Sequence, residues 1–481
     1  MKKLLAIALL LVLQLSAKAQ FLDSLQVQAG TQVSVASKDY LPFWLVSNRF
    51  GVISDQQFDF ATHVKATNSH RLGAPTSIYN EDDRGIYISY GADIYNNDHL
   101  SKNIIEQAYI RTRYKNITFS AGRFEQIIGE VDPDLSSGSL GVSGNALPIT
   151  KLNLSMEYTD IPLTNGWIQF KGMFSHGWMG NDQFMKHAYL HEKNLYFRLG
   201  KHKLKFYGGI QHYAVWGGSR DDFFKTGRSW KDWLNVVTGI EANDGSVLGN
   251  IAPNRPGDHR GIIEYGGEWD GDRVKVQLNA QTPFDSGQGI DVRNTDRLVS
   301  LNITNKDEGA IWKKFVFEFL TTKQMNDFYP GHVRESYYNN GIYRTGWEYN
   351  DHVVGSPLFI NRVRGSKYFD AIKPHDWDAP VSTIPGADNI IGNRIVGGNV
   401  GAMLALTENI TTKTKITYTK NYGTFLVNIF SPYKTEWYTM QEVSWHMPNT
   451  QLSLTGTIAY DFGDLSTNFG SMFGLQWQLR R

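Results

Sequence analysis

Residues 452–460 read LSLTGTIAY, and residues 473–480 read FGLQWQLR. In both stretches the apolar side chains stand at alternate positions, with small or polar residues between them. A period of two places the apolar residues on one face of an extended strand and the others on the opposite face. These stretches therefore predict strands that have one apolar face and one wet face.

The same period of two continues along nearly the whole chain and predicts about twenty strands. The predicted strands span residues 25–35, 58–66, 86–95, 106–114, 117–123, 152–159, 167–175, 194–200, 203–212, 262–270, 273–282, 298–304, 314–321, 342–350, 356–364, 398–406, 412–420, 436–446, 451–460 and 470–480. Many half-wet strands fit either a soluble sandwich or propeller, or a transmembrane barrel. The chain shows no repeat of roughly 20–50 residues, which weakens the propeller interpretation.

Three properties of these strands favour the transmembrane barrel. Many segments reach about nine or ten residues, the length that a tilted strand needs to cross a bilayer. Their polar faces carry Lys, Arg, Glu and Gln, which suit a water-filled lumen, and many apolar faces carry aromatic residues near their ends, as an interfacial girdle does. We therefore predict an all-β fold, a transmembrane antiparallel β-barrel in the cell outer membrane.

The connections between the predicted strands alternate between short and long. The long connections are 36–57, 124–151, 176–193, 214–261, 283–297, 322–341, 365–397 and 421–435. Outer-membrane barrels have short periplasmic turns and longer outer loops, so we place all of these connections on the outer side. The stretch 67–85 is the exception, because it is a long connection on the periplasmic side.

Two of the long connections contain a helical pattern. Residues 229–240 space Trp230 and Trp233 with other apolar residues as an amphipathic helix does, and residues 182–193 have a similar pattern. We predict a short helix in the connection 214–261, packed inside the lumen or across its mouth. This connection has 48 residues, which is too long for an idle surface loop. We expect it to fold into the lumen as a plug or lid.

The first residues have the pattern of a secretory signal peptide. Lys2 and Lys3 precede the unbroken apolar run 4–13, and residues 17–19 read AKA, a small-x-small cleavage site. The apolar run is too short to span a bilayer. We therefore predict that residues 1–19 are cleaved and that residues 20–481 form a single outer-membrane barrel domain.

Composition excludes several classes of function. The chain has no cysteine, which rules out disulfides, thiolate metal sites and a cysteine nucleophile. Its formal net charge is +1, from 48 Lys and Arg against 47 Asp and Glu. This balance gives no reason to expect a nucleic-acid partner.

Motifs for catalysis are scarce. The sequence contains no G-x-S-x-G elbow, no phosphate-binding loop and no G-x-G-x-x-G after a strand. His187 and His191 are four residues apart, which would place both imidazoles on one face of a helix, but no third metal ligand is evident. We therefore expect no metal, no cofactor and no catalysis. A hydrolase whose residues are scattered over strands stays an alternative.

Aromatic and polar residues concentrate in residues 213–235, which read YAVWGGSRDDFFKTGRSWKDWLN. An aromatic ring stacks on the C–H face of a sugar, and charged groups form paired hydrogen bonds with its hydroxyls. The candidate carbohydrate-binding residues are Trp216, Arg220, Asp221, Asp222, Arg228, Trp230 and Trp233, with Trp44, Arg49 and Trp377 in two smaller clusters. Alternatively, the tryptophans pack a girdle or anchor a plug, and the Arg–Asp pairs brace the lumen wall.

Four contiguous stretches resemble the capsule assembly Wzi family as found in the Bacteroidetes. They are AGRFEQIIG at 121–129, SSGSLGVSGNALPI at 136–149, GWIQFKGMFSHGWMG at 166–180 and LHEKNLYFRLGKHKLKFYGGIQHYAVWGG at 190–218. The resemblance implies an 18-stranded outer-membrane barrel that acts as a lectin and holds capsular polysaccharide at the cell surface. Our count of twenty exceeds eighteen, and we attribute the excess to two loop pieces that have a strand-like pattern. Enterobacterial members carry an N-terminal periplasmic helical segment, for which we expect no counterpart here.

The resulting hypothesis is a non-catalytic outer-membrane lectin that binds capsular or extracellular polysaccharide and helps to attach or assemble the capsule. Its expected partners are that polysaccharide and outer-membrane lipid, with no nucleic acid, and the expected state is a monomer. Two alternatives remain open. One is a channel or porin for small solutes, and the other is an outer-membrane hydrolase.

Overall fold

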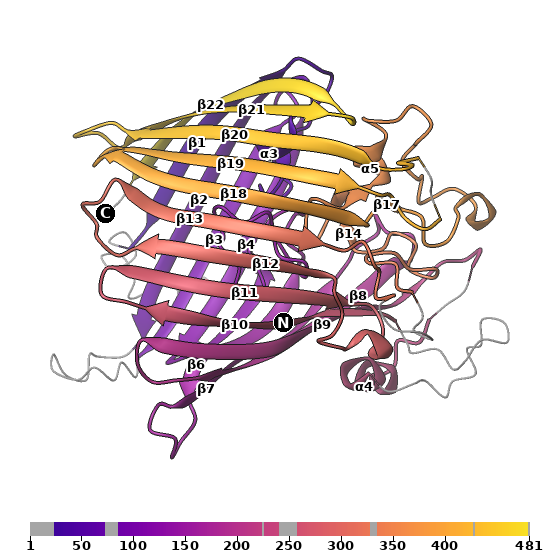
Figure 1. Cartoon of the computed structure of the whole chain (residues 1–481), viewed down its shortest axis with the longest axis horizontal. Coiled ribbons are helices and arrows are strands. Elements are labelled where there is room, and N and C mark those ends of the chain that lie inside the picture. The colour runs from indigo at the N-terminus through magenta and orange to yellow at the C-terminus, as the bar shows by residue number, and fades with distance from the viewer. Residues whose placement is uncertain are drawn as a thin grey trace, which may run out of the picture.

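A computed structural model describes residues 24–72, 85–223, 226–239, 257–327, 334–426 and 429–479. Eighteen antiparallel strands form one sheet that closes on itself, because β1 pairs with both β2 and β22 (Figure 1). The predicted transmembrane barrel of about 18 strands is confirmed. The barrel strands are β1 (Gln26–Ala36), β2 (Phe58–Leu72), β3 (Ile86–Asn97), β4 (Lys102–Tyr114), β5 (Ile117–Arg123), β6 (Lys151–Asp160), β7 (Ile168–Trp178), β8 (Lys186–Leu199), β9 (Leu204–Ser219), β10 (Asp258–Asp270), β11 (Val274–Phe284), β12 (Arg297–Asn305), β13 (Trp312–Thr321), β18 (Ile395–Thr407), β19 (Ile410–Asn421), β20 (Lys434–His446), β21 (Leu452–Gly463) and β22 (Thr467–Leu479).

The two excess strands of the prediction lie in one connection. Segments 342–350 and 356–364 belong to residues 322–394, which join β13 to β18. In the described residues of this connection, the strands are two or three residues long. These short strands are β14 (Glu348–Tyr349), β15 (His352–Val353), β16 (Ile360–Asn361) and β17 (Ile390–Gly392), paired as two small sheets. Their apolar residues are buried on every side, so they match a strand pattern without belonging to the barrel.

The alternation of the barrel strands separates lipid from lumen. In β13, Phe317 and Phe319 are 43% and 52% exposed on the outer face, whereas Glu318 between them is buried in the lumen. Apolar residues outside and polar residues inside are the arrangement of an outer-membrane barrel. Among the described residues, no helix is long and apolar enough to cross a bilayer.

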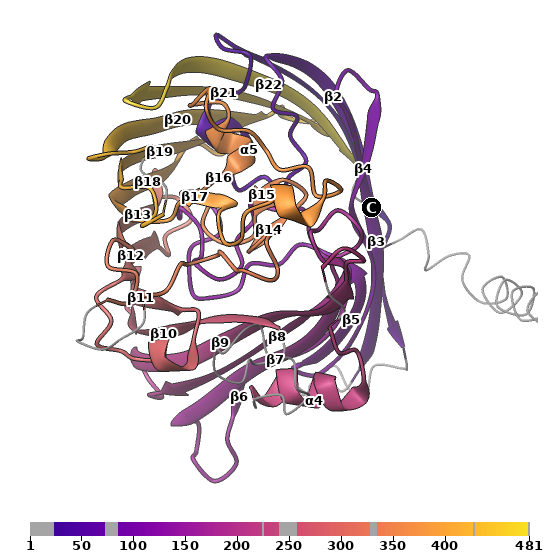
Figure 2. The same ribbon diagram turned by 90° about the vertical axis from the view of Figure 1, so that its right-hand side faces the viewer.

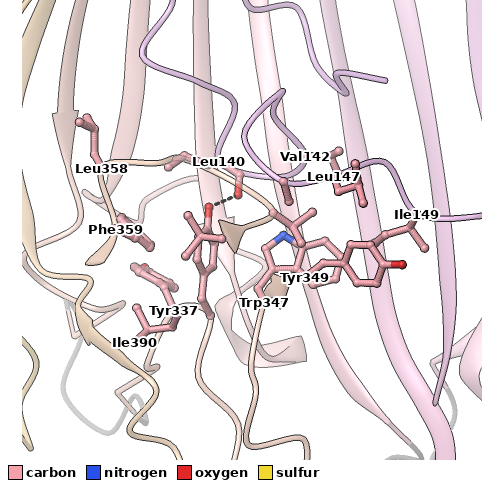
Figure 3. Packing of buried hydrophobic residues seen from close by; sticks show 14 of the residues in the cluster. Leu140, Val142, Leu147, Ile149, Tyr337, Trp347, Tyr349, Leu358, Phe359 and Ile390 are labelled. Atoms are coloured by element: carbon pink, nitrogen blue, oxygen red, sulfur yellow. Dashed lines mark hydrogen bonds between the residues drawn. The ribbon is translucent and has the colours of Figure 1, made fainter. Parts of the chain in front are cut away.

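Two long connections enter the lumen, residues 124–150 and the described residues of 322–394, and residues 43–46 of the β1–β2 connection pack beside them (Figure 2). Their apolar side chains form a core inside the barrel, which includes Leu140, Trp347 and Ile390 (Figure 3). The Trp347 Nε1 donates to the Gly141 carbonyl at 2.7 Å, and the Tyr338 hydroxyl donates to the Leu140 carbonyl at 2.6 Å. We call these two connections the plug.

Polar side chains of the barrel wall hold the plug backbone. Glu318 accepts hydrogen bonds from the Ser136 hydroxyl at 2.6 Å and the Ser137 amide at 2.7 Å. Gln281 accepts one from the Leu140 amide at 2.9 Å. A buried backbone segment without such partners would lose free energy for each unpaired group. The polar inner face therefore serves the plug, and not only water.

The connection 214–261 is predicted to form the plug, but its described residues, 214–223, 226–239 and 257–261, lie elsewhere. Its predicted helix is confirmed as α4 (Trp230–Thr238), which begins at the capping residue Ser229 and ends at Gly239 in the left-handed conformation, with φ of 67°. The placement inside the lumen or across its mouth is wrong for the described residues of the helix. Instead, α4 lies on the outside of the barrel (Figure 2). Its Val236 is buried in one cluster with Trp216 of β9. The rest of the predicted helical run, Ile240, lies outside the described residues.

The helical pattern predicted at 182–193 is also wrong. Residues from Lys186 onward belong to β8, which pairs with β7 on one side and β9 on the other. Hydrogen bonds to two neighbouring strands override a local helical pattern. His187 and His191 consequently do not share a helix face, because His187 is exposed at a position with φ of 54° and His191 is buried. The remaining helices are α3 (Phe43–Val46), α5 (Arg362–Gly365), η1 (Gly287–Gly289) and η2 (Val381–Thr383).

One acidic side chain lies deep in the plug. Glu348 is 2% exposed, and its Oε2 accepts hydrogen bonds from the Nδ2 atoms of Asn361 at 2.7 Å and Asn389 at 2.8 Å. Burial raises the pKa of Glu348 from 4.5 to about 7. The neutral carboxyl group is therefore favoured in the folded plug.

We expect Trp347→Ala to loosen the plug without opening the sheet. Truncating a buried tryptophan costs about 3–5 kcal/mol, and the hydrogen bond to Gly141 is lost as well. Limited proteolysis should cut residues 322–394 faster, and planar-bilayer conductance should rise, while heat-modifiability on gels persists. Trp167→Ala, which removes a 55% exposed tryptophan, is the control. Equal proteolysis of both variants would contradict the role of Trp347.

We expect Glu348→Gln to flatten the pH dependence of plug stability. Because the folded pKa is raised, Glu348 stabilises the plug fully below pH 4.5, and this contribution disappears as the pH rises through about 7. The change amounts to about 3 kcal/mol, because each pKa unit is worth about 1.4 kcal/mol. Proteolysis of residues 322–394 between about pH 5 and pH 8 measures it, with Glu408→Gln in an exposed turn as control. A parental pH profile in Glu348→Gln would contradict the assignment.

Candidate functional site

A cleft of about 610 Å³ lies at the end of the barrel that carries the long connections. This volume lies within the range of small-molecule binding sites. The cleft forms where the β1–β2 connection, the β3–β4 turn, the β7–β8 connection and the two plug connections meet. It is lined by aromatic residues, by hydrogen-bonding residues and by charges of both signs, among them Tyr40, Phe43, Asp55, Asp98, Lys102, Asp182, Asp351, His352, Phe359, Asn361, Arg364, Lys367 and Tyr368.

One wall of the cleft combines two tyrosines with an ion pair. The Tyr40 and Tyr368 rings meet edge to face, with centroids 6.2 Å apart. Lys367 forms an ion pair with Asp55, and its Nζ lies 5.5 Å from the centre of the Tyr40 ring. Asp55 also accepts a hydrogen bond from the Leu41 amide at 2.9 Å. Each charged group of this wall is thus held in a defined position by its neighbours.

The hydroxyl groups of both tyrosines stay protonated. Burial raises the pKa of Tyr40 and raises that of Tyr368 well above the ordinary value of 10. The Tyr40 hydroxyl lies 2.7 Å from the Ser466 Oγ, and the Tyr368 hydroxyl accepts a hydrogen bond from the Arg364 Nε at 3.1 Å. The Arg364 guanidinium also stacks 4.5 Å from the centre of the Phe43 ring. Aromatic rings and cations therefore alternate beneath this wall.

The opposite wall is built by a tight turn of the plug. Asn350 and Asp351 join β14 to β15, and both have positive φ, 48° and 65°. Two central residues with positive φ define the hairpin turn that Asn and Asp favour. Asn361 donates a hydrogen bond to the Asp351 carbonyl at 2.7 Å, which ties the turn to the plug core. Asp351 is exposed and His352 is partly exposed, so both line the cleft from a fixed backbone.

None of the ten sequence-predicted binding residues is among the residues that line this cleft. Trp44 is buried in the lumen, where its Nε1 donates to the Thr417 hydroxyl at 3.2 Å and the Lys415 Nζ lies 3.4 Å from its ring centre. Arg49 forms a 2.9 Å ion pair with Glu442 on the barrel wall. These two residues brace the β1–β2 connection against the lumen wall, which was the alternative interpretation.

The three tryptophans of the 213–235 stretch lie on the outside of the barrel. Trp216 points outward from β9 and is 3% exposed because α4 covers it. Trp230 and Trp233 stack on α4 with centroids 4.4 Å apart, and Trp230 is 69% exposed. These side chains therefore face away from the lumen and the cleft.

The charged residues of the same stretch connect two outer loops. Arg220 is buried, forms a 2.7 Å ion pair with Asp222, and donates to the carbonyl groups of Trp377 at 2.6 Å and of Ala379. Asp222 accepts a hydrogen bond from the Val381 amide at 2.7 Å. The other charged residues predicted in this stretch are Asp221 and Arg228. Asp221 is exposed, and Arg228 donates hydrogen bonds to the carbonyls of Lys186 and His187.

Sequence reasoning missed the cleft because its residues come from distant segments. Lys367 and Asp55 are 312 positions apart, so no window of sequence contains both. The Asn350-Asp351 pair was the available signal, because two such residues between short apolar runs predict a hairpin turn. That signal locates the turn but does not reveal what the turn faces.

The comparisons with known proteins agree with this architecture. The family model of the capsule assembly protein Wzi matches residues 44–361. Among solved structures, Escherichia coli Wzi, described as an outer membrane protein involved in group 1 capsule assembly and a carbohydrate binding β-barrel, matches with a TM-score of 0.55 and 14% identity over 98% of this chain and 87% of its own.

Pseudomonas aeruginosa OccK5 matches with a TM-score of 0.47 and 9% identity over 96% of this chain and 99% of its own. No curated protein matches the chain. The family match covers well over half of the chain, from the β1–β2 connection through most of the plug to β16. The protein therefore belongs to the capsule assembly Wzi family and has an 18-stranded barrel of the outer-membrane type.

Proposed function

We propose that this barrel is a non-catalytic lectin that binds capsular or extracellular polysaccharide in its outer cleft and thereby helps to attach or assemble the capsule. The observation that carries the proposal is the cleft itself, where Tyr40 and Tyr368 adjoin the Lys367–Asp55 ion pair above a filled lumen. Membership of a capsule assembly family and the fold shared with a carbohydrate binding barrel support it.

The chemistry of the cleft suits a polymer of sugars. A sugar ring offers a C–H face for an aromatic ring and several hydroxyls for charged groups. Tyr40 and Tyr368 supply aromatic rings for the C–H face, and Lys367, Asp351 and His352 supply polar groups for the hydroxyls. A repeating polymer presents the same epitope many times, so modest affinity for each unit gives strong retention through avidity.

The plug supports a binding function over a channel. The core of the plug contains Leu140, Trp347 and Ile390, each at most 1% exposed, inside the barrel. A channel for solutes needs a continuous wet path through the lumen, and such a path does not fit around a packed apolar core. The plug instead gives the cleft a rigid base.

The arrangement of Asp55 supports binding without hydrolysis. Glycoside hydrolysis needs two carboxyl groups beside the bond, one of which stays protonated. Asp55 is engaged by Lys367 and by the Leu41 amide, which suits a group that orients a ligand. We further propose that residues 1–19 are a cleaved export signal and that residues 20–481 work as one monomeric domain. Residues 1–23 lie outside the described part of the chain.

Removal of the cleft ion pair tests the proposal. We expect Asp55→Ala with Lys367→Ala to weaken retention on immobilised capsular polysaccharide by about tenfold or more, because a charge-assisted hydrogen bond contributes about 1.5–3 kcal/mol. The matched control removes the exposed Lys203–Asp272 ion pair at the opposite end of the barrel, and binding should persist. Trp216→Ala with Trp230→Ala should also bind normally, since both residues lie outside.

Two results would contradict the proposal. Parental binding by the Asp55→Ala, Lys367→Ala variant would exclude the cleft, and loss of binding only in the double tryptophan variant would return the site to residues 213–235. Size-exclusion chromatography of the polymer after incubation checks the non-catalytic assignment. The chain length of the polymer should be unchanged, and shortened polymer would show a hydrolase.

A further inference from the structure

A second cavity, of about 590 Å³, opens on the outside of the barrel between α4 and the loop that carries η1. Its floor contains Leu195 of β8 and Ile210 of β9, which pair directly and are 44% and 39% exposed. Both belong to the outward-facing row that contacts lipid. The C-terminal end of α4 and Ile290 of the η1 loop close its sides. We call this cavity the outer groove.

Polar residues stand directly above this apolar floor. Lys193 pairs with His212 two positions closer to the long-loop end of β8 and β9. The His212 Nε2 lies 2.9 Å from the His259 Nδ1. The Lys193 Nζ also donates to the Val237 carbonyl at the end of α4, which fixes the ammonium group at the rim. The outer groove thus has an apolar lower part and a cationic, hydrogen-bonding upper part.

The height of this boundary matches the edge of a bilayer. On β10, Trp269 is 47% exposed near the short-turn end, and His259 stands ten positions before it, near the long-loop end. At about 3.4 Å per residue and a tilt of about 40°, this separation spans roughly 25 Å across the membrane. The apolar band of an outer-membrane barrel is about 25 Å tall. Trp269 and His259 therefore mark the two interfaces.

The helix beside the outer groove is itself suited to a membrane surface. One face of α4 packs on the barrel through Trp233 and Val236, whereas Trp230 and Leu234, four positions apart, are 69% and 41% exposed. A tryptophan and a leucine on the free face of a short helix at this height fit the headgroup region of a bilayer. The outer groove is thus continuous with the lipid-facing surface.

We propose that the outer groove binds one lipid of the outer leaflet, with an acyl chain on Leu195 and Ile210 and an anionic phosphate headgroup at Lys193. Charge complementarity selects the phosphate, since Lys193 presents a cation at the rim. Asp285 also lines the groove, but burial raises the pKa of its carboxyl group, which weakens its repulsion of a phosphate. The Trp216 and α4 cluster then serves lipid rather than sugar.

Native mass spectrometry of the full chain in an uncharged detergent tests this assignment. Three probes separate the contributions: dioctanoyl phosphatidic acid carries both parts, dioctanoylglycerol lacks the phosphate, and inorganic phosphate lacks the chains. We expect one phosphatidic acid to be retained, about tenfold more strongly than either other probe. Lys193→Gln should lower this retention about tenfold, and the matched Lys231→Gln on the exposed face of α4 should not.

Ile210→Trp provides a second variant, because a larger side chain fills the floor and leaves the charge intact. Retention should fall here as well, while heat-modifiability and polysaccharide binding persist, which separates this proposal from that for the cleft. Equal retention by Ile210→Trp and the parent would overturn the proposal. So would inorganic phosphate binding as strongly as phosphatidic acid, since the site would then be a simple anion site.

Discussion

The pairing of the first barrel strand with the last one determines the rest of the molecule. In a bilayer every backbone polar group needs an internal partner, so a transmembrane sheet must close. Here β1 pairs with β22 from Val27 opposite Leu479 to Ala36 opposite Gly470. In the closed sheet, alternate residues of every strand face lipid or the lumen. With eighteen strands, the lumen is too wide for the side chains of the barrel wall to fill it alone.

The plug occupies part of this wide lumen, and its outer end lines the candidate site. Residues 124–150 and 322–394 bury their apolar side chains against each other, and the polar inner wall satisfies their backbone. The packing leaves no space for a side chain at Gly141, where a Cβ atom would stand 2.5 Å from the Tyr213 hydroxyl. The tips of the same connections then form the cleft, with Asn361 linking the Asp351 turn to buried Glu348.

The sequence predicted the barrel because each wall strand faces lipid on one side and polar groups on the other. The same rule failed at 342–350 and 356–364, where Trp347 and Phe359 are buried in the plug on all sides. It also could not say which connection fills the lumen. Length favoured 214–261, whose described helix α4 lies outside the barrel. The core inside the lumen instead joins residues of other connections, such as Leu140 and Trp347.

The candidate site was harder to predict than the fold, for a geometric reason. Residues 213–235 are adjacent in sequence but separate in space, since Trp216 points outward from its strand and Arg220 lies past the strand end, where it binds the 377–379 backbone. The cleft residues behave in the opposite way. Tyr40, Asp55 and Lys367 are brought together only by closure of the sheet and folding of the plug.

Hydrogen exchange with and without capsular polysaccharide measures the central claim most directly, because it locates the polymer on the unmodified protein. Exchange should slow in residues 47–56 and 350–353, which line the cleft, and stay unchanged in α4. Protection confined to α4, or no protection in the cleft segments at saturating polymer, would contradict the claim that this barrel binds polysaccharide above its plug.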